Sequence, residues 1–222
     1  MTTTVDSRHL VARSLRTAPI IAVVRTSSRE EAARQARVFS SSGLELIEIT
    51  FSVPGATGLV RELLAARKDR GGEGPPWIGM GTVTTAARAR EAVAAGAEFL
   101  VTPNVNVEVA AVAREAGLFL AMGALTCSEI VAAHELGSDI VKVFPLPPVG
   151  GPAYLSVIRG PLSDIPMMAS GGYGIEEIPA YAAAGAEAFG IGGPLLGADD
   201  EESRRRIARG LELARQGRKE IR

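Results

Sequence analysis

The chain has 222 residues, of which 46% are hydrophobic, 22% charged and 5% aromatic, and its formal net charge is −1. There is no surplus of Lys and Arg and there are few aromatic side chains, so the composition is that of a globular protein without a nucleic-acid-binding surface. No apolar run reaches membrane-spanning length, residues 1–15 lack the apolar core of a signal peptide, and Cys127 is the only cysteine. We therefore expect a cytoplasmic protein whose partner is a small-molecule substrate.

Apolar runs of strand length recur along the chain, and each is followed by an alanine-rich amphipathic segment. The predicted strands are residues 19–25, 44–51, 77–83, 99–104, 118–125, 139–145, 166–172 and 188–193. Helices fill the gaps between them. The segment 27–43, for example, opens with a serine cap and ends on Gly43, and later helices end on Gly96, Gly117, Gly137 and Gly185. A further helix over about 6–17 precedes the first strand, and the last covers about 201–215.

Eight such units in about 200 residues predict an α/β fold, a (β/α)8 TIM barrel with an additional N-terminal helix. The alternative is an open doubly wound sheet, but eight regular repeats without a break favour closure. The one linker-like stretch, residues 68–76, is too short to separate domains and is interpreted as a surface loop. We expect a single domain over residues 1–222.

One lysine stands at the centre of an apolar strand, in a chain with three lysines and twenty-one arginines. Lys142 shares a strand face with Ile140 and Phe144, while Val141 and Val143 occupy the other face. The valine pair suits packing under helices, so Lys142 is expected to point into the barrel. A buried ammonium is costly unless it is paired or loses its proton.

A carboxylate is predicted to point into the same interior. Glu48 shares a face of its strand with Leu46 and Thr50. Alternate strands contribute to one interior layer, so Glu48 and Lys142 can meet over the barrel axis. Two interpretations remain open: a buried structural ion pair, or a catalytic amine with a carboxylate that moves protons. Apolar surroundings lower the pKa of a lysine and supply the neutral amine that a Schiff base needs, which an arginine cannot do.

Polar residues and glycines gather at strand ends, where the active site of such a barrel lies. Ser170, Gly171 and Gly172 end the seventh strand, and Gly192 and Gly193 end the eighth. Glycines there let backbone N–H groups approach phosphate or another anion; simple turn chemistry is the alternative. The spacing is not that of a dinucleotide fingerprint.

Three other strand ends carry candidate residues. Arg25 suits a carboxylate or phosphate contact, or else a salt bridge at the rim. Thr82 either donates to a carboxylate or caps the next helix, and Pro103 follows Thr102 at the end of the fourth strand. The two histidines are far apart in the sequence, so neither a metal site nor another cofactor is expected.

These residues resemble the 2-keto-3-deoxy-6-phosphogluconate / 4-hydroxy-2-oxoglutarate aldolase family nearly from end to end. The similar stretches are PIIAVVR, GLELIEITF, IGMGTV, GAEFLVTPN, IVKVFP, GGPAYL, SGG and GIGG. VTPN and the GGPAYL loop are also similar to the 6-phosphogalactonate branch. The resemblance implies metal-free class I aldolases, homotrimers of (β/α)8 barrels whose extra N-terminal helix closes the barrel bottom.

The resemblance also implies site residues. Lys142 matches the Schiff-base lysine and Glu48 the general acid/base. Thr82 matches a residue that contacts the pyruvate carboxylate, and Pro103 and Phe144 match residues that line the pocket. Ser170 stands where many members have Thr before the phosphate-binding glycines. Those glycines correspond to Gly171, Gly172, Gly192 and Gly193.

Four positions depart from the family pattern. Ser52 replaces an arginine common four residues after the catalytic Glu, so Arg25 carries more of the anion recognition. Pro194 replaces a serine that helps hold phosphate, and it offers neither a hydroxyl nor an N–H. Met80 and Met122 are expected in the pocket, where smaller residues or Pro are common.

The predicted function is cleavage of a 2-keto-3-deoxy (6-phospho) sugar acid to pyruvate and an aldehyde, by an aldehyde-lyase that forms a lysine Schiff base. The alternatives are another phosphate-binding barrel enzyme, such as an isomerase or decarboxylase, and a barrel that binds a sugar acid without catalysis. Neither the phosphate nor the configuration at C4 is determined by the sequence.

Overall fold

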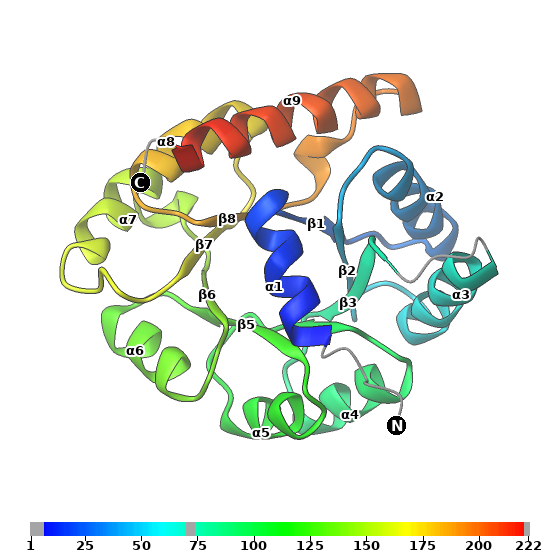
Figure 1. Ribbon diagram of the computed structural model, residues 1–222, viewed down its shortest axis with the longest axis horizontal. Helices are drawn as coiled ribbons and strands as arrows, with labels where there is room; N and C mark the ends of the chain where they lie inside the picture. Colours follow the sequence, from blue (N-terminus) through cyan, green and yellow to red (C-terminus); the bar gives the residue numbers. More distant parts are fainter. Residues whose placement is uncertain (1–6, 70–73, 220–222) are drawn as a thin grey trace.

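A computed structural model describes residues 7–69 and 74–219, in which parallel strands close into a barrel in the order β1 to β8, with β8 paired to β1 (Figure 1). The strands are β1 Ile20–Val24, β2 Leu46–Thr50, β3 Trp77–Gly81, β4 Phe99–Val101, β5 Phe119–Ala124, β6 Ile140–Val143, β7 Met167–Ser170 and β8 Ala188–Ile191. The predicted (β/α)8 barrel is confirmed, and so are all eight predicted strands. In the described barrel each strand pairs with a neighbour on both sides, whereas the open-sheet alternative would expose two edge strands.

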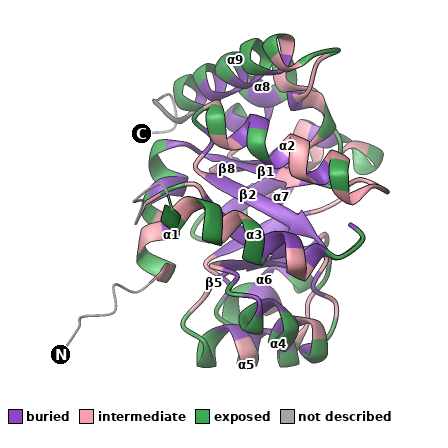
Figure 2. Cartoon of the chain, turned by 90° about the vertical axis from the view of Figure 1, so that its right-hand side faces the viewer, coloured by how far each residue is buried: buried purple, intermediate pink, exposed green. Residues whose placement is uncertain are grey.

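Helices surround the strands and keep their outer faces exposed (Figure 2). They are α1 Ser7–Thr17, α2 Arg29–Ser41, α3 Ala56–Asp69, α4 Ala86–Ala94, α5 Val107–Glu115, α6 Cys127–Glu135, α7 Gly151–Arg159, α8 Ile178–Ala183 and α9 Asp200–Lys219, with short 3-10 turns at Pro147–Val149, Ile175–Glu177 and Gly193–Leu195. Ser28 caps α2 by accepting from the Glu31 N–H, as predicted. Within the described residues, no helix has the length and apolar character to cross a membrane.

Two sequence-based boundaries differ from the structure. The prediction of a loop at GGPAYL is wrong, since α7 begins at Gly151 within this stretch. Pro152 suits the first turn of a helix. The loop predicted over 68–76 begins later, since α3 continues to Asp69. Residues 70–73 of that loop, and residue 6 of the predicted first helix, lie outside the described residues.

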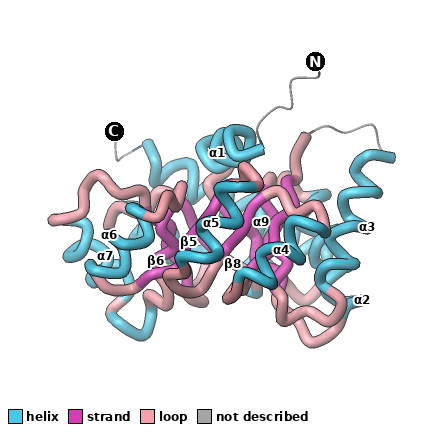
Figure 3. Tube along the Cα trace, turned by 90° about the horizontal axis from the view of Figure 1, so that it is seen from below, coloured by secondary structure: helices cyan, strands magenta, loops and turns pink. Residues whose placement is uncertain are grey.

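The α1 helix closes the end of the barrel at which the strands begin (Figure 3). Val11 and Leu15 of α1 pack into the interior cluster that contains Trp77 and Phe119, the first residues of β3 and β5. The Trp77 indole N–H donates to Ser14 Oγ at 2.9 Å, which satisfies the one polar atom that the ring carries. Ligands therefore approach from the opposite end, where the strands finish.

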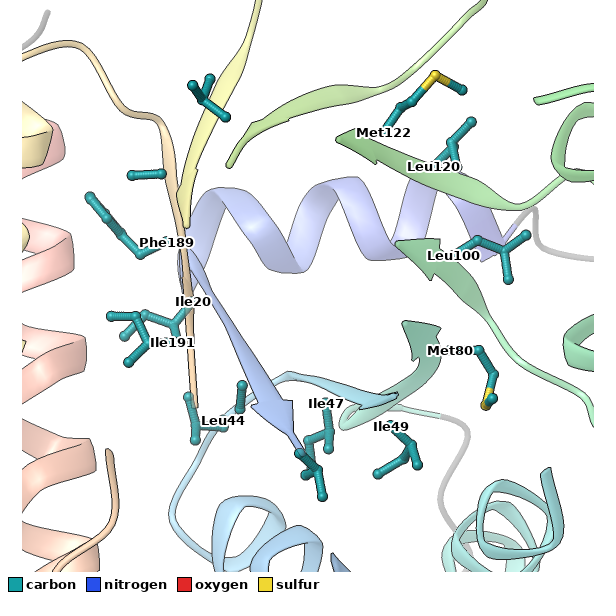
Figure 4. Close-up of a cluster of buried hydrophobic side chains, with 14 of the residues drawn as sticks. Ile20, Leu44, Ile47, Ile49, Met80, Leu100, Leu120, Met122, Phe189 and Ile191 are labelled. Atoms are coloured by element: carbon teal, nitrogen blue, oxygen red, sulfur yellow. The ribbon is translucent and has the colours of Figure 1, made fainter. Parts of the chain in front are cut away.

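The strands alternate between interior residues and residues that face the helices. Gly79 and Gly81 of β3 face inward, because a Cβ at these positions would meet Phe99 and Glu48. Met80 lies between them on the outer side and belongs to the core under the helices, together with Met122 of β5 (Figure 4). The expectation that these two methionines line the pocket is therefore wrong, since both are fully buried in the helix-facing layer.

Candidate active site

Lys142 is the third residue of β6 and lies in register with Gly123 of β5 and Met168 of β7. Its neighbours in β6, Val141 and Val143, belong to the helix-facing core, so the alternation turns the lysine inward as predicted. The residue is only 5% exposed, and its Nζ lies 4.9 Å from the centre of the Phe144 ring. An amine is thus held inside an apolar layer of the barrel.

Glu48 occupies the corresponding interior position of β2 and is 1% exposed. Its carboxyl group lies directly over Gly81, where an added Cβ would come within 1.7 Å of Oε1. A glycine at position 81 is therefore required by the space that the carboxyl group fills. Among the described residues, Glu48 Oε1 is a buried polar atom without a hydrogen-bond partner.

The environment favours the neutral form of both groups. Burial lowers the pKa of Lys142; the charge of Glu48 opposes this and that of Arg25 adds to it. Burial likewise raises the pKa of Glu48, against the opposing charges of Lys142 and Arg25. In the described part of the chain, no ion pair within 4.0 Å joins Lys142 to Glu48. The geometry thus disfavours a structural ion pair, the first of the two interpretations above.

Arg25 follows β1 at the open end of the barrel and is solvent-exposed. Its Nη2 donates to Thr82 Oγ1 at 3.3 Å, so these two predicted residues lie side by side. Thr82 has φ 59°, a left-handed conformation that is costly for a β-branched residue and is typical of functional sites. The alternative of a helix cap is wrong for Thr82, because Thr85 caps α4.

A cavity of about 390 Å³ opens between the ends of the strands. Its lining is Val23, Arg25, Gln35, Lys142, Phe144, Ser170, Gly171, Gly172, Gly190, Gly192, Gly193 and Pro194. It brings together eight of the predicted site residues: Arg25, Lys142, Phe144, Ser170, Gly171, Gly172, Gly192 and Gly193. Such a volume suits a small ligand rather than a polymer.

Three predicted residues lie outside this lining. Glu48 is buried in the interior and Thr82 lies beside Arg25. Pro103 is not brought to the cavity; its backbone lies against Gly123, where an added Cβ would meet the Pro103 carbonyl carbon at 2.2 Å. The role of Pro103 as a lining residue stays a prediction.

Sequence reasoning missed Gln35, which reaches the cavity from α2. The inward and outward alternation applies to strands only, so it does not predict which helical residues face the ends of the strands. A larger groove of about 880 Å³ between α2 and α3 contains none of the predicted site residues. In residues 7–69 and 74–219, no group of three or more His, Cys, Asp and Glu side chains is placed to hold a metal ion.

A profile described as KDPG and KHG aldolase matches residues 11–209. The chain belongs to this family. The predicted family membership is therefore confirmed, and so is the prediction of an aldolase-type lyase. A 2-dehydro-3-deoxy-phosphogluconate aldolase from Treponema pallidum is 32% identical over 74% of this chain and 75% of its own length.

Two further relatives connect this family member to the galactonate branch. A probable 2-dehydro-3-deoxy-6-phosphogalactonate aldolase from Rhizobium meliloti is 32% identical over 80% of this chain and 81% of its own length. A solved structure described as native KDPGal superposes with a TM-score of 0.80 at 27% identity, covering 90% of this chain and 96% of that one. Relatives named for both branches are thus similar to this chain over most of its length.

Proposed function

We propose that this family member is a class I aldolase that cleaves a 2-keto-3-deoxy sugar acid, phosphorylated or free, to pyruvate and an aldehyde through a Schiff base on Lys142. The observation that carries the proposal is the pair of unmatched buried groups, an amine that lines the cavity and a carboxyl group without a partner. Buried titratable groups with perturbed pKa values, near the C-terminal ends of barrel strands, are typical of catalytic sites.

The first proposed step is attack of the neutral Lys142 amine on the C2 ketone of the substrate. The tetrahedral adduct loses water and becomes a protonated imine, which withdraws electrons from the neighbouring carbons. Because burial lowers the pKa of Lys142, a larger fraction of the amine is unprotonated at neutral pH than in an exposed lysine.

The second proposed step is cleavage of the C3–C4 bond. Glu48, directly or through a water molecule, removes the proton of the C4 hydroxyl; the C3–C4 electron pair moves into the imine, and the aldehyde leaves. The enamine is then protonated at C3, and hydrolysis releases pyruvate and regenerates the amine. One carboxyl group thus acts first as base and then as acid, which a raised pKa of Glu48 favours.

The remaining residues are proposed to hold the substrate. Arg25, with Thr82 beside it, binds the C1 carboxylate, and the Phe144 ring packs against the pyruvate part. The aldehyde part lies along Ser170 and the backbone of the four glycines, which line the same cavity: Gly171, Gly172, Gly192 and Gly193. Those glycines leave room for a hydroxyl or a phosphate group close to the main chain.

Borohydride reduction in the presence of pyruvate tests the proposal. Reduction of the imine should add a pyruvate-derived mass to the peptide that contains Lys142, and the protein should lose activity. Omitting pyruvate is the control. A label on Lys68 or Lys219, or no label at all, would contradict the assignment.

Coupled detection of pyruvate with free and phosphorylated 2-keto-3-deoxy acids of both C4 configurations then identifies the substrate. We also propose that the chain forms one domain, works in the cytoplasm without a cofactor and assembles as a homotrimer. Light scattering should give a mass three times 23.1 kDa, and a mass of 23.1 kDa would contradict the trimer.

A further inference from the structure

Gln35 lines the cavity, and the mechanism above gives it no role. It belongs to α2, so it reaches the ends of the strands from the helix layer. Gly192, Gly193 and Pro194 line the same cavity just beyond β8. The two glycines have no side chain, and Pro194 has an apolar side chain and no backbone N–H. Of these four lining residues, Gln35 is therefore the one with a polar side chain.

The amide group of Gln35 is held in place by its own helix. Its Nε2 donates to Glu31 Oε1 at 2.9 Å. Arg34 donates to both oxygens of the same carboxylate at 2.8 Å and also pairs with Asp200 at the start of α9. Hydrogen bonds from Arg34 and Gln35 lower the pKa of Glu31 to about 2. Glu31 is therefore ionised at any physiological pH.

An ionised carboxylate can only accept hydrogen bonds, and this fixes which way the Gln35 amide points. The nitrogen must face Glu31, so the carbonyl oxygen Oε1 lies on the other side of the amide group. No donor from the described residues reaches that oxygen. Gln35 thus lines the cavity with a side chain whose amide oxygen is an acceptor without a donor from the described residues.

The charged groups of the lining are Arg25 and Lys142, which the proposed function assigns to the C1 carboxylate and the C2 carbonyl. In this part of the lining Gln35 carries the acceptor without a donor among the described residues, and its amide nitrogen is bonded to the anionic Glu31. A hydroxyl group that donates a hydrogen bond fits this environment. A carboxylate does not, because its oxygens would face an acceptor and a negative charge.

We propose that Gln35 is a specificity-determining residue that accepts a hydrogen bond from a hydroxyl group on the aldehyde part of the substrate. The enzyme then prefers hydroxylated 2-keto-3-deoxy sugar acids over 4-hydroxy-2-oxoglutarate, whose corresponding part ends in a carboxylate. The inference rests on the proposed function, since it needs the cavity to bind the aldehyde part beyond the bond that is cleaved.

The test compares kcat/KM for 2-keto-3-deoxygluconate and 4-hydroxy-2-oxoglutarate in the wild type and in Gln35→Leu. We expect the wild type to favour the sugar acid. Gln35→Leu should lower kcat/KM for the sugar acid about tenfold, the usual effect of one neutral hydrogen bond. The value for 4-hydroxy-2-oxoglutarate should stay constant or rise, so the ratio between the substrates falls.

Gln216→Leu is the matched control. Gln216 also donates to a glutamate four residues earlier, Glu212 Oε1 at 3.1 Å, but it lies on the exposed face of α9. This variant should leave both kcat/KM values unchanged. Gln35→Asn, which keeps the amide but withdraws it from the wall, should reproduce the fall in the ratio if Gln35→Leu unfolds.

An unchanged ratio in the Gln35 variants, or an equal fall for both substrates, would overturn the inference by making Gln35 a structural residue. Borohydride trapping with pyruvate separates this failure from that of the proposed function. Trapping at Lys142 that persists while the ratio does not change removes only the role of Gln35. A wild type without trapping at Lys142 contradicts the proposed function and the inference together.

Discussion

Two sites in this barrel bury a cation and a carboxyl group, and they do so in opposite ways. Arg67 of α3 and Glu98, just before β4, form a two-pronged ion pair with contacts of 2.6 and 2.9 Å. The Ile78 N–H donates to the same carboxylate, Arg67 donates to the Pro76 carbonyl, and its guanidinium lies 5.4 Å from the Trp77 ring centre. Lys142 and Glu48 are more deeply buried but form no such pair, and Glu48 Oε1 has no partner.

This difference distinguishes an ion pair that stabilises the fold from titratable groups that are available for chemistry. At the first site both carboxylate oxygens of Glu98 and both terminal nitrogens of Arg67 are paired, and Arg67 Nε alone lacks a partner among the described residues. This ion pair ties α3 to the start of β3 and β4, where a planar guanidinium is the suitable cation. An amine and a carboxyl group that are buried but unmatched are costly to the fold. Lys142 lines an open cavity and Glu48 is buried in the barrel interior, and we propose that a substrate completes the missing contacts.

The largest expected effect comes from replacing the amine. Lys142→Met should lower aldolase activity on the order of 10⁵-fold and abolish the pyruvate-derived label, because the covalent route is lost. The measurement is pyruvate release together with the mass of the peptide after borohydride reduction. Arg67→Met serves as the control at the paired site and should still be labelled. Residual labelling of the Lys142→Met protein would place the imine on another group.

A smaller loss is expected from Glu48→Gln, which keeps the size of the side chain but removes its acid–base function. Turnover should slow by about 10²- to 10⁴-fold, while imine formation with pyruvate persists. Steady-state rates and borohydride trapping on the same sample measure the two steps separately. Normal turnover in this variant would remove Glu48 from the mechanism.

The free energy of unfolding should depend more on the Arg67–Glu98 ion pair than on Lys142, although activity depends on Lys142. Arg67→Met leaves the Glu98 carboxylate buried without its cation, so the free energy of unfolding should fall by about 2–3 kcal/mol. Denaturant titration measures this. Arg205→Met, at the exposed pair with Glu201, should change it by an amount close to experimental error. Equal effects at the two positions would show that burial does not distinguish these pairs.

A smaller change than that of Arg67→Met is expected from Lys142→Met, which should gain stability in a way that depends on pH. The folded chain holds Lys142 at a lowered pKa, so the unfolded chain binds a proton more readily below the lysine value of about 10.4. At neutral pH the variant should therefore be more stable by about 1 kcal/mol. The gain should shrink as pH rises through the unfolded pKa. Denaturant titrations at pH 7 and pH 10 test this, and a gain that grows with pH would contradict it.

The architecture could be predicted from the sequence because its signals are local and repeated. The run around Ile47 and Ile49 has strand length, and Gly43 and Gly96 end helices with φ values of 83° and 87°. The same alternation placed Lys142 and Glu48 in the interior. These are properties of neighbouring residues, which a single sequence contains.

The lining of the cavity depends on how separate elements pack against each other. The inward and outward alternation within a strand does not predict this packing. Gln35 reaches the cavity from α2, which packs against β1 and β2, and Pro103 lies against Gly123 rather than in the cavity lining. The misplacement of Met80 has another cause. The alternation along β3 turns Met80 outward into the helix-facing core, whereas the family resemblance implies a pocket position.

The central claim is that Lys142 is kept as a neutral amine, and NMR titration of the lysine side chains tests it most directly. The chain has three lysines, so selective labelling of lysine Nζ gives three signals, and the one missing from Lys142→Met belongs to Lys142. Because burial lowers its pKa, we predict that this signal titrates below the ordinary lysine value of about 10.4. A Lys142 pKa at or above that value would contradict the account.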